Sequence, residues 1–468
     1  MSRRLRAFKR WMRNHQIDCS DVLAFKEDDQ GISVQAVCDL KEGDLVATIP
    51  KQACLTIKTS VANELIEEAG LGGSLGLSLA LMFERSLGEE SAWYGYLQLL
   101  PERECVPLVW SMEEVDTLLM GTELHKIVKE DKTLLYEDWK ECILPLISSP
   151  SSKLGATSFG VEQYLAAKSL VASRAFQIDD FHGFGMVPLA DLFNHKTGAE
   201  NVHFSLSFSS DSDVEDEERN NIPENNDHKA STKDVTTDSS DDDQTPLEMI
   251  IVRDVEAGFE VFNTYGSMGN AALLHRYGFT EPDNQFDIVN IDLELILQWS
   301  SSSFSKRYCR ARLSIWRKLG WSGCLSQNSE YFEISSQGEP HLELLVLLYI
   351  IFLPEERYHE LNCTQGSSGV YGKSRTILVN NKNGAQDNTR EMLLTRSVCQ
   401  ALVALADIRE GLYGPNSLQD DLNALRRCGI QERKLYHSLV LRVSERTILE
   451  RLRIYSSRSF NKRKRKVF

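Results

Sequence analysis

Two stretches of the chain decide its fold: Met186-Val-Pro-Leu-Ala-Asp-Leu-Phe-Asn-His195, and Glu260-Val-Phe-Asn-Thr-Tyr-Gly266, which continues through Asn270 to Tyr277-Gly-Phe279. The first follows an apolar strand pattern and ends in an Asn-His pair, and the second carries two tyrosines. These side chains can seat a polar cofactor and orient a neutral amine. We therefore expect the two stretches to share one site.

The segment between them explains most of the net charge. Residues 209–245 hold thirteen Asp and Glu against three Lys and Arg, a balance of −10 in a chain of formal charge −16. Such a polar, aromatic-poor segment buries too little apolar surface to offset the entropy of ordering. We predict a disordered acidic loop over about 207–246, and the overall acidity then says little about the substrate.

Length and composition indicate a globular protein with more than one domain. At 468 residues the chain exceeds one ordinary core, and 42% hydrophobic with 26% charged residues is typical of soluble domains. The longest apolar run, residues 344–353, is too short to span a bilayer and predicts a buried helix, so we expect no membrane segment. Ten scattered cysteines without a Cys-x-x-Cys pair predict free thiols, no zinc and no other metal.

Hydrophobic periodicity divides the chain into blocks and predicts an α+β fold, with a β-rich core split by a helical insertion and followed by an all-α C-terminal domain. Strand and turn signals occupy residues 22–50, 183–195 and 249–264, and helical periodicity occupies residues 60–165 and 283–455. The predicted domains are an N-terminal helix (1–20), the core domain (21–282, with the insertion at about 60–165), a helical domain (283–455) and a basic tail (456–468).

Both ends are basic. Residues 3–13 contain six Arg and Lys, as in an organellar presequence, but Leu5, Phe8, Trp11 and Met12 share one helical face, which favours a mature helix. Residues 458–466 hold six basic residues and no acid, which indicates a nuclear import signal, a tail that touches nucleic acid, or merely a solvated end. We expect the nucleus, with the cytoplasm as a second location, rather than a chloroplast or mitochondrion.

The Asn194-His195 pair alone leaves three chemistries open: a metal site, a nucleophile-assisting site and a cofactor seat. A metal needs further ligands, and only Asp191 is nearby in the sequence. A hydrolase needs a nucleophile, and the chain has no Gly-x-Ser-x-Gly motif. Neither of these two is supported by the residues.

The combination of motifs is specific. Gly31 to Ala36, Arg-Ala-Phe176, the Pro-Leu-Ala-Asp-x-x-Asn-His stretch and the Tyr-Gly-x-x-x-Asn…Tyr-Gly-Phe stretch occur in this order. Together they resemble the SET-domain protein-lysine methyltransferases. The likeness is to the branch that contains the Rubisco large-subunit methyltransferase and its nuclear and ribosomal-protein-modifying relatives. It covers roughly residues 5–455 and implies a split SET core with a C-terminal Rubisco-methyltransferase-type substrate-binding domain.

This resemblance implies S-adenosylmethionine as the cofactor and names its contacts by position. Gly31 suits a close backbone approach because it has no Cβ, Arg174 has a guanidinium fork suited to the cofactor carboxylate, and His195 would act through its backbone. The implied cofactor-binding residues are Gln30, Gly31, Ile32, Arg174, Asn194 and His195.

The resemblance also implies a lysine channel. Tyr265 matches the active-site tyrosine, and the implied substrate contacts are Phe176, Ile178, Asp191 and Tyr277. Methyl transfer from a sulfonium to nitrogen is an in-line displacement, so the amine lone pair must be free and aligned. A lysine ammonium has a pKa near 10.4, and an aromatic channel that disfavours charge helps to deprotonate it.

The chain departs from the family pattern at two points. Ser33 replaces the second glycine of the first motif, and the spacing from Tyr265 to Asn270 is one residue shorter than in the chloroplast enzyme, although the nuclear relatives share it. We expect neither departure to abolish activity.

Two other functions remain open. One relative of this fold methylates a histidine, with an asparagine at the position matching Phe176 and no tyrosine at that matching Tyr277; the residues here favour lysine. A non-catalytic peptide-binding module would be indicated by loss of Tyr265, Asn194 or His195, and none is lost. We expect a monomer whose partner is a non-histone, histone-variant or ribosomal protein with a lysine in an exposed segment, and no direct nucleic-acid binding.

Overall fold

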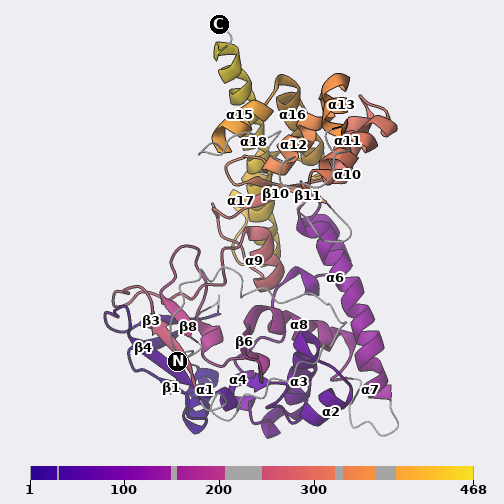
Figure 1. Cartoon of the computed structure of the whole chain (residues 1–468). Helices are drawn as coiled ribbons and strands as arrows, with labels where there is room; N and C mark the ends of the chain where they lie inside the picture. Colours follow the sequence, from indigo (N-terminus) through magenta and orange to yellow (C-terminus); the bar gives the residue numbers. More distant parts are fainter. Residues whose placement is uncertain are drawn as a thin grey trace. The chain divides into compact units, whose positions relative to one another are not determined.

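The computed structural model describes residues 2–28, 31–148, 155, 157–205, 245–321, 330–363 and 386–466, which form two compact units (Figure 1). The first unit comprises Met1–Trp110, Val128–Met268 and Leu274–Gly278, and the second comprises Ser111–Ile127, Gly269–Leu273 and Phe279–Phe468. Gln30 and almost all of the predicted acidic loop lie outside the described residues.

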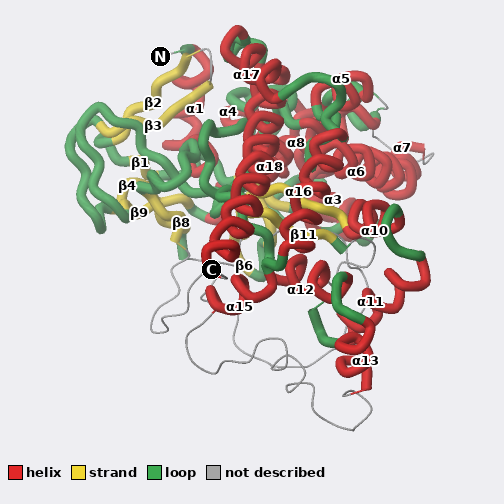
Figure 2. The backbone as a smooth tube through the Cα atoms, turned by 90° about the horizontal axis from the view of Figure 1, so that it is seen from above, coloured by secondary structure: helices red, strands yellow, loops and turns green. Residues whose placement is uncertain are grey.

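The β-structure of the first unit joins strands that are far apart in the sequence. Its four-stranded antiparallel sheet has the order β1 (Asp18–Cys19), β4 (Leu45–Ile49), β9 (Leu247–Ile251) and β8 (Val202–Ser205), and these strands lie side by side in Figure 2. In β9 the alternate residues Leu247, Met249 and Ile251 are buried, as expected for a strand with one face on the core. The N-terminal strands and the later strands thus build one core around the helical insertion.

Two smaller sheets complete this core. A hairpin pairs β2 (Leu23–Asp28) with β3 (Gly31–Ala36), and a three-stranded sheet has the order β5 (Leu55–Thr56), β7 (Gly183–Met186) and β6 (Ala175–Asp179). β7 leads directly into the motif that ends at His195, so this sheet sets where the motif begins.

The helices of the first unit are α1 (Arg3–Asn14), α2 (Asn63–Glu68), α3 (Gly73–Leu87), α4 (Tyr94–Leu97), α7 (Leu144–Ser148), α8 (Val161–Arg174) and most of α6 (Leu124–Asp138). Of these, α3 and α8 pack against the three-stranded sheet, and other helices pack around them. α1 buries the apolar face predicted from its sequence, and Trp11 packs so closely that a Cβ on Gly95 would lie 2.4 Å from it. Trp11 Nε1 also donates to the carbonyl of Ala92 at 2.7 Å. The basic N-terminal segment is therefore part of the folded unit.

The second unit is largely helical. Its helices are α5 (Met112–Leu118), α10 (Leu293–Ser301), α11 (Lys306–Lys318), α12 (Leu342–Ile351), α13 (Glu355–Cys363), α15 (Gln386–Leu393), α16 (Arg396–Gly411), α17 (Leu418–Arg427) and α18 (Arg433–Lys466). α12 is the expected buried apolar helix, with seven of its residues in the core. Within the described ranges, no helix combines the length and apolar character that crossing a membrane requires.

One feature of this unit differs from the all-α expectation. β10 (Ile288–Asp292) and β11 (Tyr331–Ser335) pair antiparallel, with Ile291 opposite Phe332 and Val289 opposite Ile334. Val289 and Ile291 are buried while their neighbours are less so, which is the period of a strand. Five residues of alternation beside a long helical pattern were too short a signal to be read from the sequence.

A buried charge network joins residues 111–127 to the C-terminal helices. Arg409 donates to the carbonyl of Gly121 at 2.5 Å and to Glu123 Oε1 at 3.0 Å, and the Glu123 amide donates to Glu445 Oε1 at 3.1 Å. A Cβ on Gly121, whose φ is +78°, would lie 2.6 Å from the backbone of Tyr413. Periodicity could not reveal this grouping, because it assigned residues 60–165 to one insertion.

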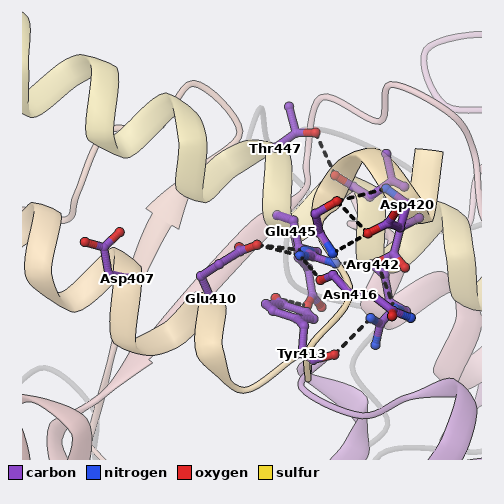
Figure 3. Close-up of polar contacts among 12 residues, drawn as sticks. Asp407, Glu410, Tyr413, Asn416, Asp420, Arg442, Glu445 and Thr447 are labelled. Atoms are coloured by element: carbon purple, nitrogen blue, oxygen red, sulfur yellow. Dashed lines mark hydrogen bonds and ion pairs between the residues drawn. The ribbon is translucent and has the colours of Figure 1, made fainter. Parts of the chain in front are cut away.

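The same network continues along α18. Arg446 donates to Asp421 Oδ2 and to Glu410 Oε1, both at 2.7 Å, and Arg442 donates to Asp421 Oδ2 at 3.1 Å. The Tyr413 hydroxyl donates to Glu445 Oε2 at 2.6 Å. Figure 3 shows Glu410 of α16, Tyr413 just after it, and Arg442 and Glu445 of α18 close together. Because buried charges are costly unless paired, this network fixes how α16, α17 and α18 pack.

Candidate active site

Residues 186–195 and 260–266, the first parts of the two motif stretches, lie side by side in the first unit. His195 pairs with Asn263 as an isolated parallel bridge, and the Asn263 amide donates to the carbonyl of Asn194 at 2.9 Å. The chain reaches this point through the 3-10 turn η5 (Ala190–Leu192), which follows Leu189 at φ +81°. A positive φ is costly for a leucine, and such strain is characteristic of functional turns.

His195 connects the stretches through its ring as well as its backbone. Its Nδ1 lies 3.0 Å from the Tyr265 amide, which donates to it, and its ring stacks on Tyr265 with centroids 5.1 Å apart. An Nδ1 that accepts a hydrogen bond carries no proton, so the neutral ring is protonated at Nε2, which lies 3.2 Å from Thr197 Oγ1. The sequence predicted only a backbone role for His195 and not these contacts of its ring.

The two predicted tyrosines are in contact. Tyr265 stacks on Tyr277, the last residue of α9 (Asn270–Tyr277), with centroids 4.3 Å apart, and the Tyr265 hydroxyl donates to the carbonyl of Phe193 at 3.1 Å. Burial raises the pKa of both phenols. Both therefore stay neutral at physiological pH and can orient a neighbouring amine through hydrogen bonds.

A glycine follows each tyrosine for a structural reason. Gly266 has φ +99° and Gly278 has φ +77°, conformations that other residues rarely adopt. A Cβ on Gly278 would also lie 2.9 Å from the carbonyl of Cys105. The second Tyr-Gly pair is thus held against the loop that follows α4.

The start of α9 is fixed by Asn270 of the same motif. Its amide and side chain donate to the two carboxylate oxygens of Asp287, and its side chain also bonds to the backbone N–H and C=O of Glu281 at 2.7 and 2.8 Å. Asn270 and Asp287 are both buried. The Asp287 carboxylate therefore caps the first amide of α9, and the Asn270 side chain ties this end of the helix to Glu281, a role that its sequence position did not reveal.

Part of the predicted cofactor seat comes together at a more exposed edge. The side chain of Asn194 donates to Glu260 Oε1 at 2.7 Å and to the carbonyl of Ile32 at 3.4 Å. Gly31 precedes Ile32 at φ +136°, and a Cβ added there would meet no atom within 4 Å. Amide, carbonyl and carboxylate groups beside open space fit a ligand that carries an amino group. Glu260 lies in the quoted motif, but its role was not predicted.

Arg174 and Asp191 belong to a buried cluster that also includes Glu104 and Tyr96. Arg174 ends α8, and its Nε and Nη2 lie 2.8 and 2.7 Å from Glu104 Oε1. Its Nη1 donates to the carbonyl and Oδ2 of Asp191 at 3.1 and 3.3 Å, and the Tyr96 hydroxyl donates to Asp191 Oδ2 at 2.8 Å. Burial raises the pKa of Asp191 although Arg174 opposes this. Burial acts to lower the pKa of Arg174, but the negative charges of Glu104 and Asp191 outweigh burial, so the pKa is raised.

This cluster leaves one acceptor available. Asp191 Oδ1 is buried and has no hydrogen-bond partner among the described residues. An unsatisfied buried carboxylate oxygen is costly, so a ligand N–H that reached it would relieve that cost. The cofactor role of Arg174 and the substrate role of Asp191 stay predictions.

The two remaining substrate residues lie on β6. Phe176 is half-buried and its ring lies 5.1 Å from that of Phe204. Ile178 is fully buried, and a Cβ on Gly185 would lie 2.6 Å from its Cδ1. Their substrate roles also stay predictions. Ser33, which replaces the family glycine, lies within β3 opposite Lys26 and does not have a positive φ.

The described residues contain no group of three or more His, Cys, Asp or Glu side chains that could hold a metal ion. The free thiols among them are Cys19, Cys38, Cys54, Cys105, Cys142, Cys309, Cys399 and Cys428.

No family model matches the chain. It is 24% identical over 483 residues to N-lysine methyltransferase setd6 of Danio rerio, which covers 96% of this chain and 94% of that protein. Human N-lysine methyltransferase SETD6 is 24% identical over 384 residues (78% and 72%). Ribosomal lysine N-methyltransferase 3 of Saccharomyces cerevisiae is 26% identical over 325 residues (56% and 59%).

Solved structures decide the fold. The SET domain of LSMT bound to lysine and AdoHcy superposes with a TM-score of 0.65 at 20% identity, over 97% of this chain and 91% of that one. Rubisco LSMT bound to AdoMet gives 0.64 at 20% identity, over 98% and 92%. The chain has the fold of the SET-domain Rubisco large-subunit methyltransferase. The expected resemblance and the expected fold class, a split SET core with a helical C-terminal region, are confirmed.

Proposed function

We propose that the chain is a protein-lysine N-methyltransferase that uses S-adenosylmethionine. One observation carries the proposal: Tyr265 is held by His195 at its amide, by Phe193 at its hydroxyl and by Tyr277 at its ring. A tyrosine fixed at three points can orient an amine, and positioning supplies much of the rate of an in-line displacement. Relatives along most of the chain carry the name N-lysine methyltransferase.

The cofactor would supply the electrophilic methyl group, and the protein would supply binding and geometry. Asn194, Glu260 and the carbonyl of Ile32 would hold its polar groups at the exposed edge. The neutral phenols of Tyr265 and Tyr277 would accept from and align the amine, and they disfavour the charged ammonium by excluding water. The free Oδ1 of Asp191 would accept an N–H of the incoming lysine.

The test is transfer of labelled methyl from S-adenosylmethionine to a lysine peptide array, read by mass spectrometry. We expect methylated lysines with the wild type. Methyl on histidine instead would support the histidine alternative, which Phe176 and Tyr277 disfavour, and cofactor binding without any transfer would support a binding module.

We further propose that the substrate is a non-histone, histone-variant or ribosomal protein with its lysine in an exposed segment. The helical second unit would bind this protein, as a substrate-binding domain of the Rubisco-methyltransferase type. The name of the yeast relative, a ribosomal lysine methyltransferase, supports the ribosomal class. We expect a monomer that does not bind nucleic acid directly. Light scattering of the purified chain, and its retention on immobilised RNA, would check these two expectations.

The proposed location is the nucleus, with the cytoplasm as a second location. Six basic residues at 458–466 support it as an import signal. Replacement of residues 462–466 by serine in a fluorescent fusion should move the protein from the nucleus to the cytoplasm. An unchanged nuclear fraction would show that these basic residues are not an import signal.

A further inference from the structure

The loop between α4 and the 3-10 turn η3 (Pro107–Val109) contacts Arg174 and Gly278 of the site. This loop lies outside the sequence motifs. Glu104 lies in this loop with 13% of its side chain exposed, and a single oxygen, Oε1, accepts both Nε and Nη2 of Arg174. Its backbone is also fixed, because the Glu104 amide donates to Ser169 Oγ at 3.0 Å and Ser169 is fully buried in α8. Glu104 is thus held at its carboxylate by Arg174 and at its backbone amide by Ser169.

The consequences run from Glu104 toward Tyr265. Arg174 is the only cation that this cluster presents to Asp191 among the described contacts, and its Nη1 bonds to both the carbonyl and the carboxylate of that residue. Asp191 lies in η5, two residues before Phe193, whose carbonyl receives the Tyr265 hydroxyl. Fixing Arg174 therefore fixes the turn that orients the phenol.

A second contact links the same loop to the other tyrosine. Cys105, the next residue after Glu104, packs against Gly278 so closely that no Cβ fits there. Gly278 directly follows Tyr277. The loop at residues 104–105 therefore braces both stacked rings, one through a chain of hydrogen bonds and the other through backbone packing.

We propose that Glu104 is a positioning residue for methyl transfer: it holds Arg174, and through Arg174 and Asp191 it sets the Phe193 carbonyl that orients Tyr265. This inference rests on the proposed function. Among the described residues, Glu104 donates to or accepts from neither tyrosine, so its hydrogen-bonded route to Tyr265 runs through Arg174. Its charge also contributes to the raised pKa of Tyr265, after burial.

The variants follow from the geometry. Glu104→Ala removes the acceptor, whereas Glu104→Gln keeps an oxygen that can accept the same two bonds from Arg174. Glu102→Ala is the matched control, since Glu102 lies in the same loop with 84% of its side chain exposed and pairs only weakly with Arg103, at 3.8 Å.

Two readouts are needed. Hydrogen exchange should show that the amides of residues 191–193 exchange roughly tenfold faster in Glu104→Ala and within about threefold of wild type in Glu104→Gln and Glu102→Ala. Turnover on the best peptide of the lysine array should fall about 30-fold in Glu104→Ala, with the KM for S-adenosylmethionine within about threefold, and Glu104→Gln should restore most of it.

Three results would overturn the inference: unchanged exchange at residues 191–193, equal acceleration throughout the first unit, or wild-type turnover in Glu104→Ala. If the wild type itself transfers no methyl, the proposed function fails, and the exchange pattern alone decides whether Glu104 orders the turn.

Discussion

Protonation of Glu445 should make the stability of the second unit depend on pH. Burial of Glu445 and the negative charge of its neighbour Glu123 both raise its pKa, and Arg409 lowers it. The first two effects are larger, so the pKa of Glu445 is raised to about 8 from an ordinary 4.5. The Tyr413 hydroxyl faces it as well, at 2.6 Å. A raised carboxyl pKa means that the folded state holds a proton which the unfolded state has released.

The sign and size follow from this difference. Stability from the bound proton is fully present below pH 4.5 and is lost as pH rises to about 8. At 1.36 kcal/mol per pH unit for one proton, unfolding free energy should fall by roughly 2 kcal/mol between pH 6 and pH 8. For a unit of about 200 residues this corresponds to roughly 4 to 8 °C in Tm.

Thermal unfolding from pH 5 to pH 9, followed by tryptophan fluorescence, measures this dependence. Glu445→Gln should remove most of the slope because glutamine does not titrate, while Glu450→Gln, on an exposed residue of the same helix, should leave it unchanged. An equal slope in wild type and Glu445→Gln would show that Glu445 is not the titrating group.

Three further substitutions test other parts of the site. Gly278→Ala should lower stability by at least 1 to 2 kcal/mol, measured by denaturant unfolding, because its Cβ would overlap the Cys105 carbonyl at 2.9 Å in a positive-φ conformation; an unchanged midpoint would contradict this, and Gly411→Ala, in open space, is the control. Asn270→Ala should cost about 1 to 3 kcal/mol because it removes the side-chain bonds to Asp287 Oδ2 and to the backbone C=O and N–H of Glu281, and an unchanged melting temperature would show that these bonds do not stabilise the fold. His195→Ala should lower turnover about tenfold, because the Tyr265 amide loses its acceptor at 3.0 Å. Methyl transfer at the wild-type rate would show that the His195 ring is not needed.

Much of the fold could be predicted because long-range pairing and local pattern agree. The strand β9 after the insertion carries alternating burial, and it pairs with β4 across some two hundred residues of sequence. The face of α1 was evident from four apolar residues at helical spacing. By contrast, the β10–β11 pair was missed because each strand alternates over only five residues.

The site was partly predictable for the same reason. Asn194, His195, Tyr265 and Tyr277 lie in motifs whose order is specific, and the structure brings them together with Ile32. Glu104 and Asp287 could not be found this way. Their roles depend on distances to Arg174 and Asn270 that are set by tertiary packing, and each stands in sequence as an ordinary acidic residue.

The most direct test of the central proposal compares Tyr265→Phe with wild type in methyl transfer to lysine peptides. The substitution removes only the hydroxyl that donates to Phe193, and Tyr94→Phe, on a tyrosine with 38% exposure, is the control. We predict methyl-lysine from the wild type and a loss of about 100-fold or more in turnover for Tyr265→Phe, with cofactor affinity within about threefold. Equal turnover in the two proteins, or no methyl-lysine from the wild type, would contradict it.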